Sequence, residues 1–263
     1  MPTPLRTAMS RFVGWAADRK IPGALRPLVY RGYARFTGAD LSEVQLPLEG
    51  YPSLGAFFVR RLKDGARSIA QDPGILVSPV DGAVQTVGPI EAGSTLQAKG
   101  RNYAVRDLLG PVADALPLER GTAWTIYLSP RDYHRIHAPA SCTLRAAHWI
   151  QGALYSVAPK VLDRRMVLPI NERVALHLDT ELGPLGFVLV GATNVGRMRV
   201  VGVQPGHDGP LDPAPRFERG QELARFEMGS TVVIVAPEET ARAIDGLDHG
   251  RPLRLGEPIG RSV

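Results

Sequence analysis

Residues 225–235 read Arg-Phe-Glu-Met-Gly-Ser-Thr-Val-Val-Ile-Val, and this stretch decides how the last part of the chain folds. Apolar and charged side chains alternate before the glycine, as in a half-buried strand, and the residues from Thr231 to Val235 are all β-branched. Gly229 therefore interrupts a strand pattern, which indicates a bulge or a close approach to the backbone. The hydroxyl of Ser230 could attack the preceding carbonyl if a base took its proton, and glycine permits the backbone conformation required. A solvated serine in a β-bulge is the plainer interpretation.

A polar, proline-bounded segment from Ser129 to Pro139 follows the apolar run Ala123 to Leu128 and is expected where a strand ends. It contains His134 and His137. Because histidine moves protons near neutral pH, the pair could supply a base for a serine and an acid for a later step. A loop with two exposed histidines and a metal site are the alternatives. The other histidines and the lone Cys142 show no recognisable ligand spacing, so no metal site is predicted.

Asp81 lies in the expected turn Ser78 to Gly82, where an Asp before Gly is usually structural. Its functional interpretation depends on partners. A carboxylate that accepts a hydrogen bond from one imidazole nitrogen fixes the tautomer and leaves the other nitrogen free to deprotonate a serine. Asp81, one of the two histidines and Ser230 could form such a relay.

With these segments in view, the chain resembles bacterial phosphatidylserine decarboxylase, a self-processing family that depends on a pyruvoyl group. The likeness rests on Ser-Pro-Arg-Asp-Tyr-His-Arg-x-His at 129–137, Leu-Gln-Ala-Lys-Gly at 96–100 and Gly-Ser-Thr at 229–231. Further matches at 171–173 and 191–196 extend it over most of the chain from about Tyr51. Met228 departs from the family, which usually has leucine there, but this exchange conserves volume.

The resemblance implies a relay of Asp81, His137 and Ser230 that cuts the chain between Gly229 and Ser230. The products would be a β chain of residues 1–229 and an α chain of residues 230–263. Ser230 would become the pyruvoyl group, the only cofactor expected.

The pyruvoyl group implied by the resemblance would form a Schiff base with phosphatidylserine and accept electrons as carbon dioxide leaves, giving phosphatidylethanolamine. His134 is then the expected acid that returns a proton to carbon, with protonated His137 as the alternative. The resemblance also implies a homodimer.

Two other functions fit parts of the same pattern. A serine hydrolase could use Asp81, His137 and Ser230, but it normally places serine in a Gly-x-Ser-x-Gly elbow before a helix, whereas Ser230 precedes β-branched residues. A non-catalytic membrane-binding β-module would leave the histidine segment without a role.

Composition and charge indicate where such a protein would act. The single cysteine excludes an internal disulfide and is consistent with a reducing cytoplasm. No apolar run approaches the roughly twenty residues that span a bilayer, and the amino terminus lacks a signal-peptide core. Residues 1–40 hold seven basic and two acidic side chains. Their net charge of +5 equals the formal net charge of the whole chain.

The same basic segment carries two apolar stripes at helical spacing, 5–16 and 25–36. Short basic amphipathic helices suit the surface of an anionic membrane, so we expect a peripheral protein on the cytoplasmic face of the cell membrane. Packing of the stripes on the protein's own core is the common alternative. Nucleic-acid binding is not expected, because no recognition motif is present.

Beyond the basic segment, short runs typical of strands alternate with Gly and Pro. The sequence therefore predicts an α+β fold, a β-rich core of short, mostly antiparallel strands with amphipathic helices at the N-terminus. We expect a membrane-associating helical segment over 1–45 and a catalytic domain over 46–263. Within the latter, 204–219 is predicted as a surface loop, and 250–260 as a final hairpin that keeps the small fragment bound.

Overall fold

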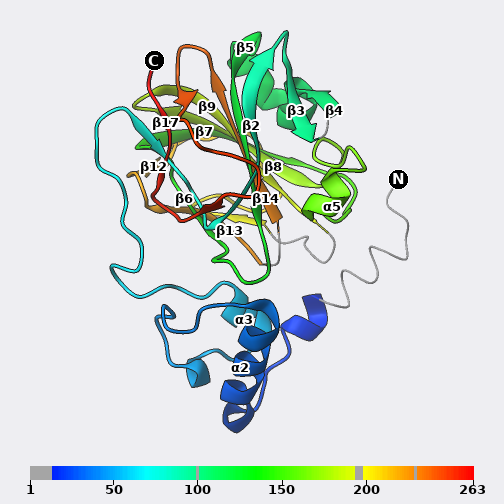
Figure 1. Ribbon diagram of the computed structural model, residues 1–263, viewed down its shortest axis with the longest axis vertical. Helices are drawn as coiled ribbons and strands as arrows, with labels where there is room; N and C mark the ends of the chain where they lie inside the picture. The colour runs from blue at the N-terminus through cyan, green and yellow to red at the C-terminus, as the bar shows by residue number, and fades with distance from the viewer. Residues whose placement is uncertain (1–13, 99–100, 193–197, 228–229) are drawn as a thin grey trace.

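All the named strands of the described residues lie beyond residue 74, and they pair antiparallel. The structure, a computed structural model, describes residues 14–98, 101–192, 198–227 and 230–263. Figure 1 shows a β-rich body with a smaller helical unit, formed by the first part of the chain, against one end of it. The predicted α+β class is confirmed.

The largest sheet is antiparallel and runs in the order β11-β7-β8-β9-β14-β5-β2-β3-β4. The bounds of these strands are β2 Gly82–Glu91, β3 Ser94–Ala98, β4 Arg101–Ala104, β5 Arg120–Leu128, β7 Cys142–Ile150, β8 Arg173–Thr180, β9 Gly183–Val190, β11 Asp208–Pro210 and β14 Ser230–Pro237. Two short strands lie off this path: β12 (Arg216–Phe217) pairs with β7, and β16 (Pro252–Leu253) pairs with β2.

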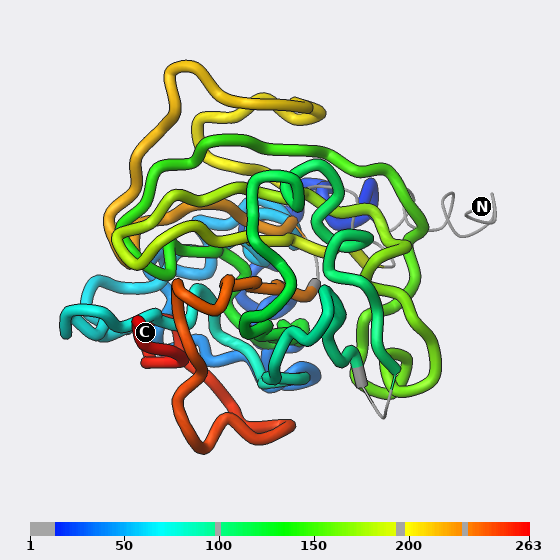
Figure 2. The backbone as a smooth tube through the Cα atoms, turned by 90° about the horizontal axis from the view of Figure 1, so that it is seen from above, coloured from blue at the N-terminus to red at the C-terminus, as the bar shows by residue number. Residues whose placement is uncertain are grey.

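Two three-stranded sheets complete the β-rich body. One has the order β1 (Ile75–Val77), β17 (Pro258–Arg261), β15 (Arg242–Ala243), and the other β10 (Met198–Val200), β13 (Glu222–Phe226), β6 (Arg135–His137). Seen from above, the C-terminal segment lies beside the chain that enters β1 (Figure 2), as the β1–β17 pairing requires. The first and last strands of the β-rich body therefore pair with each other, although they lie far apart in the sequence.

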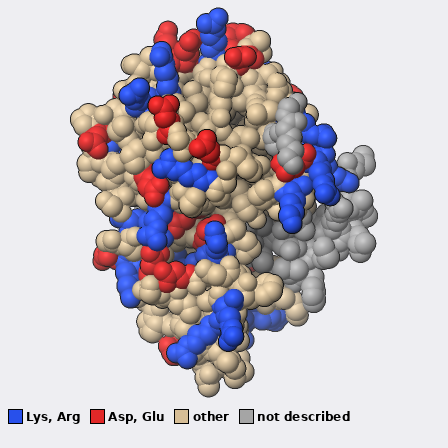
Figure 3. All heavy atoms as spheres, in the orientation of Figure 1, with Lys and Arg blue, Asp and Glu red and all other residues tan. Residues whose placement is uncertain are grey.

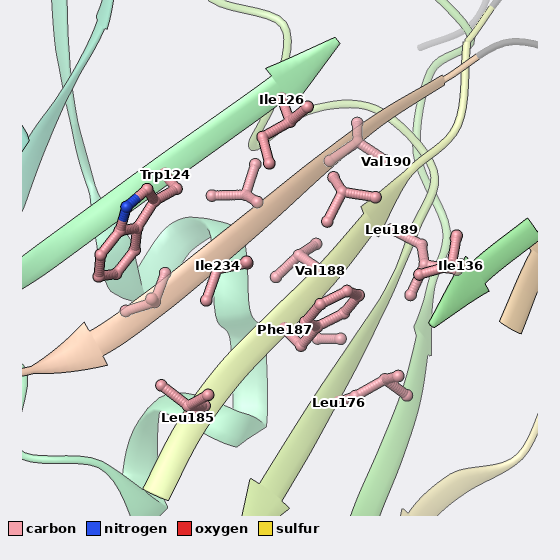
Figure 4. Close-up of a cluster of buried hydrophobic side chains, with 14 of the residues drawn as sticks. Trp124, Ile126, Ile136, Leu176, Leu185, Phe187, Val188, Leu189, Val190 and Ile234 are labelled. Atoms are coloured by element: carbon pink, nitrogen blue, oxygen red, sulfur yellow. The ribbon is translucent and has the colours of Figure 1, made fainter. Parts of the chain in front are cut away.

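The core is built around β14, which pairs with β5 on one side and β9 on the other. Its β-branched residues Thr231 to Val235 are fully buried, because a central strand covered on both faces has no solvent side. Figure 4 shows their neighbours from β5 and β9, including Trp124 and Phe187. The short helix α4 (Val105–Leu109) packs on β9 at Gly186, where a Cβ would lie 2.6 Å from a Leu109 methyl, and η3 (Gly110–Ala115) packs on β7 and β8.

The helical unit has a hydrophobic cluster of its own. It contains α2 (Arg26–Thr37) and α3 (Leu54–Phe58), with 3₁₀ turns η1 (Gly23–Leu25) and η2 (Leu48–Gly50); the remaining helix, α5 (Pro159–Leu162), belongs to the body. Tyr30, Val44, Tyr51 and Phe57 form the cluster, with the Tyr30 and Phe57 rings stacked at 4.5 Å. The cluster draws residues from both sides of the boundary expected at residue 45.

Helix α2 leaves several of its large apolar side chains exposed to solvent. Tyr30 and Ala34 are buried, whereas Leu28 is 71% and Phe36 91% exposed. Of the expected stripe over 25–36, Tyr33 packs partly on the cluster, whereas Leu25, Leu28, Val29 and Phe36 are exposed. Most of the other expected stripe, 5–16, lies outside the described residues. Within the described part of the chain, every helix is too short or too polar to span a bilayer.

Two expectations for the later chain were wrong. The segment 204–219 carries β11 and β12, which pair with β7, so it covers a sheet edge. The tail is not a hairpin, because β16 pairs with β2 while β17 pairs with β1 and β15. Both errors arise because strands of two to four residues carry too little pattern of their own and take their register from partners distant in sequence.

Candidate active site

Three strand ends bring the predicted site residues to one edge of the large sheet. β5 ends at Leu128, and its antiparallel neighbours β2 and β14 both begin there. Ala83 pairs with Tyr127 and Ser230 pairs with Leu128. Asp81, the start of the histidine segment and the backbone of Ser230 therefore meet at this edge, called here the active-site edge, which faces the helical unit in Figure 1.

The turn that follows β5 is held from within and from the helical unit. The Asp132 carboxylate accepts from both the backbone N–H and the hydroxyl of Ser129 at 2.7 Å. The Tyr33 hydroxyl of α2 donates to the carbonyl of Pro130 at 2.5 Å, and Arg135 donates to the carbonyl of Val59 at 2.9 Å. The histidine segment is thus clamped between the two parts of the molecule.

His137 is held as a neutral base. Its backbone N–H donates to the Pro79 carbonyl at 2.9 Å, two residues before Asp81. Nδ1 lies 2.7 Å from the Gly220 carbonyl, and since a carbonyl only accepts, Nδ1 carries the proton. Nε2 then accepts from the Tyr133 hydroxyl at 3.1 Å. Burial, the largest cause, lowers the pKa of His137, so the ring is neutral at pH 7.

His134 is fully buried against Phe58, with the ring centroids 3.9 Å apart. Its Nδ1 donates to the Asp132 carbonyl at 2.8 Å, so the lone pair lies on Nε2. That Nε2 is buried and has no hydrogen-bond partner among the described residues. Its backbone carbonyl accepts from Phe226, at the end of the strand that leads to Gly229. Burial lowers the pKa of His134 to about 3, so the ring is neutral in the uncut chain.

Asp81 does not hold the imidazole of His137 in the described structure, contrary to expectation. Its carboxylate accepts from Arg67 Nε at 2.9 Å and Nη2 at 2.5 Å, and from the backbone N–H of Leu255 at 2.8 Å. A guanidinium makes stronger, charge-assisted hydrogen bonds than a neutral imidazole, and Gly220 already accepts from the His137 Nδ1. Asp81 acts on His137 through its charge, which raises the pKa of His137 against the effect of burial.

Of the peptide bond expected to be cut, the structure describes only the Ser230 side. The backbone of Ser230 is placed by its pairing with Leu128, and Gly229 lies outside the described residues. The structure therefore brings Asp81, His134, His137 and the Ser230 backbone to one region, and their roles in cleavage stay a prediction.

Sequence reasoning missed three groups at this edge. Arg67, with its side chain 9% exposed, bridges Asp81 and the Glu43 carboxylate of the helical unit. Tyr133 contacts the basic nitrogen of His137, and Gly220 fixes its tautomer. Tyr133 lay within a quoted motif, whereas Arg67 and Gly220 carried no local signal because their partners are distant in sequence.

Comparison with known proteins agrees with this geometry. The family model described as "Phosphatidylserine decarboxylase" matches residues 54–261. The chain is 40% identical over 266 residues to the phosphatidylserine decarboxylase proenzyme of Marinobacter nauticus, covering 97% of this chain and 93% of the relative. It is 40% identical to the proenzyme of Pseudomonas aeruginosa (95% and 91% covered) and 38% identical to that of Myxococcus xanthus (97% and 94% covered).

The chain belongs to the phosphatidylserine decarboxylase family. The resemblance inferred from the motifs is therefore confirmed, and the chain is an enzyme of the carboxy-lyase class. The names of the relatives describe a proenzyme, a precursor that is processed to its active form. The matched range of the phosphatidylserine decarboxylase model includes the whole active-site edge and α3. Helix α2 lies before the start of this range.

Proposed function

We propose that the chain cuts itself between Gly229 and Ser230 and then decarboxylates phosphatidylserine to phosphatidylethanolamine with a pyruvoyl group made from Ser230. The observation that supports the proposal is that β14 begins beside the last residue of β5, Leu128, and that the segment after β5 holds two imidazoles whose Nδ1 atoms are each fixed by a carbonyl. The unpartnered Nε2 of His134 fits a site that must still accept a hydrogen bond or a proton.

In the cleavage step, the Ser230 oxygen attacks the Gly229 carbonyl carbon and an imidazole Nε2 takes the hydroxyl proton. The C–N bond of the amide breaks and an ester forms in its place. A base then removes the Cα proton of residue 230, the Cβ–O bond breaks, and the products are a carboxylate on Gly229 and a dehydroalanine at 230. Its imine tautomer reacts with water, releasing ammonia and leaving the ketone. His137 is the proposed base, because its Nδ1–H is fixed by Gly220 and only the Tyr133 hydroxyl must move to free Nε2.

In the decarboxylation step, the pyruvoyl group supplies an electron sink conjugated to the substrate's nitrogen. His134 moves a proton at Nε2. That Nε2 has no hydrogen-bond partner among the described residues, and it is the atom proposed to return a proton to carbon after carbon dioxide leaves. The buried, apolar setting beside Phe58 keeps bulk water from the reacting carbon.

We also propose that the helical unit binds the cytoplasmic face of an anionic membrane. Leu28 and Phe36 project into solvent from α2 beside the exposed cations Arg31 and Arg35, a combination suited to the lipid interface. A homodimer remains the expected assembly, and light scattering coupled to gel filtration would measure it.

Intact-mass measurement of the purified protein tests self-processing. We expect two fragments, 1–229 and 230–263, with the smaller one lighter than its unmodified sequence because serine has become pyruvoyl. Ser230→Ala should give one uncut chain of full mass. Recovery of the wild-type protein as one active, uncut chain would refute the proposal. Conversion of phosphatidylserine to phosphatidylethanolamine, lost on borohydride treatment in the presence of substrate, tests the second step.

A further inference from the structure

A pocket of about 250 Å³ opens between the helical unit and the active-site edge. We call it the junction pocket. Its lining comes from both parts of the molecule: Gly38, Asp40, Glu43, Arg60, Leu62 and Arg67 from the first, and Asp81, Gly82, Arg131, Asp132, Tyr133, Pro252, Leu253 and Arg254 from the second. Charges of both signs gather where the two parts meet on the face shown in Figure 3.

Arg60 lines this pocket as a buried cation, and none of the ion pairs found among the described residues involves it. The residue is 3% exposed. Its Nη2 donates to the carbonyls of Arg131 and Asp132, but Nε and Nη1 have no hydrogen-bond partner among the described residues. The face of Phe57 lies 5.2 Å from the guanidinium carbon. A buried charge left in this state costs free energy, which a bound anion would recover.

Asp81 and Asp132 act on Arg60 through their charge, but the hydrogen bonds and ion pairs described for the four carboxylates of the lining go to other groups. Asp40 bonds to Ser42, Glu43 pairs with Arg67 and Arg254, Asp81 pairs with Arg67, and Asp132 bonds to Ser129 and pairs with Arg131. Two further cations, Arg131 and Arg254, have mostly exposed side chains. Arg131 Nε lies 3.6 Å from the Asp132 carboxylate and Arg254 Nη1 lies 3.5 Å from the Glu43 carboxylate, so an incoming anion at the mouth of the pocket would share or replace these exposed ion pairs.

We propose that the junction pocket binds a phosphate-bearing anion, with Arg60 as the buried cation and Arg131 and Arg254 at the mouth. Arginine is suited to this role, because its planar fork matches phosphate oxygens. The volume lies just below the range of about 300–1,000 Å³ typical of drug-sized ligands, so it admits a small polar headgroup and leaves acyl chains outside. Since Asp81 lines the same pocket, the phosphodiester of the substrate lipid is one source of this chemistry and free phosphate the other; the first rests on the proposed function.

Calorimetric titration of the Ser230→Ala chain tests the proposal, because this chain keeps the pocket and cannot form a ketone that would capture amines. The probes are inorganic phosphate and glycerophosphoserine, a headgroup without acyl chains, at constant ionic strength. Saturable binding of either probe is expected. Binding of glycerophosphoserine alone assigns the site to the lipid headgroup, and binding of phosphate alone assigns it to the free anion. Absence of saturable binding by both overturns the proposal.

Arg60→Gln should weaken binding by about tenfold or more, as expected for loss of a hydrogen bond to a charged group. Arg61→Gln is the matched control, because it removes the same charge from a side chain that is 63% exposed and does not line the pocket, and it should retain affinity. Arg131→Gln with Arg254→Gln changes only exposed side chains and should also weaken binding, which keeps the test open if Arg60→Gln fails to fold. Equal affinity in all these variants would contradict the assignment of the site, as would equal losses for Arg60→Gln and Arg61→Gln. Self-cleavage of the parent chain is measured separately, so failure here leaves the proposed function standing.

Discussion

At the residue scale, the burial of His134 predicts a pH dependence of stability. The folded chain holds this pKa at about 3, below the ordinary 6.5, so the unfolded chain binds a proton that the folded chain does not. The contribution is fully present above pH 6.5 and is lost as the pH falls from 6.5 toward 3. Over that window we expect the free energy of unfolding to fall by up to about 1.4 kcal/mol per pH unit from this group.

His134→Asn isolates that effect, because its amide can replace Nδ1 as the donor to the Asp132 carbonyl. Both proteins are compared in the Ser230→Ala background by denaturant unfolding at several pH values. The wild-type imidazole should give the steeper loss of stability in acid. Equal slopes for the two chains would mean that His134 is solvated.

His137 gives a prediction for the rate of cleavage. Because burial holds its pKa below the ordinary 6.5, the neutral base predominates at pH 7, so the rate should change little between pH 7 and 8 and fall in more acidic solution. His137→Ala should slow cleavage by about 10²–10⁴-fold, the usual contribution of a general base. A time course of fragment appearance after refolding measures both. A rate still rising from pH 7 to 8 would point to a different base.

The site was predictable from sequence where its chemistry lies within one motif. Asp81, His134 and His137 were named from residue type, spacing and the family resemblance, and their roles stay a prediction; the backbone N–H of His137 does bond to the Pro79 carbonyl, two residues before Asp81. The hydrogen bonds among them were not predictable. Asp81 bonds to Arg67 where His137 was expected, and His137 bonds to the Gly220 carbonyl where Asp81 was expected. Only the folded chain brings these partners close.

At the element scale, Gln97 fastens β3 to the segment after α5. Its side-chain NH₂ donates to the carbonyls of Leu162 and Arg165, and its oxygen accepts from Val167. Gln97→Glu would face two carbonyls with a carboxylate, so we expect a loss of about 2–4 kcal/mol in the free energy of unfolding. Faster tryptic cleavage at the exposed Arg164 and Arg165 would report the release of this segment.

Gln71→Glu is the matched control for Gln97→Glu. Gln71 is exposed, and its side chain donates a hydrogen bond to the Ile69 carbonyl. It should leave both stability and the tryptic pattern almost unchanged. Equal changes in the free energy of unfolding for Gln97→Glu and Gln71→Glu would mean that the buried hydrogen bonds of Gln97 do not stabilise the fold.

Helix α2 gives the membrane prediction. Deletion of residues 1–36 would test membrane binding poorly, because it also removes Tyr30, which is buried in the cluster of the helical unit. Leu28→Ser with Phe36→Ser changes only exposed side chains. We expect it to lower binding to anionic vesicles in a sedimentation assay by about tenfold or more, since each apolar side chain buried in lipid contributes roughly 1.5–3 kcal/mol. Unchanged sedimentation would exclude α2 as the contact.

Elements were predictable where one strand carries its own pattern. The β-branched run of β14 and the alternating residues of β13 gave both strands, and the Gly229–Ser230 junction does separate two sheets. By contrast, β16 and β17 hold few apolar residues each, and their partners β2 and β1 come much earlier in the chain. Local pattern cannot assign such a pairing, which is why a hairpin was predicted instead.

At the scale of the whole molecule, the position of β14 predicts that the two fragments stay together after cleavage. The α chain supplies the central strand of the large sheet, paired with β5 along its whole length and with β9 along Thr231 to Val235. It also supplies β16 and β17, and the Trp124 indole of the β chain donates to the Ile259 carbonyl of the α chain. Burial of four of its apolar side chains, Val232 to Val235, contributes roughly 6–12 kcal/mol at about 1.5–3 kcal/mol each.

Native gel filtration of the cleaved protein measures this association. Both fragments should elute in one peak with the circular dichroism of the uncut Ser230→Ala chain, and separate only in denaturing guanidinium. Val233→Asp should weaken the association, because it places a charge on a strand buried on both faces, whereas Glu239→Ala, on an exposed position of the same fragment, should not. Free α chain in the native column would mean that cleavage dismantles the sheet, and a lasting pyruvoyl enzyme could not then be built on β14.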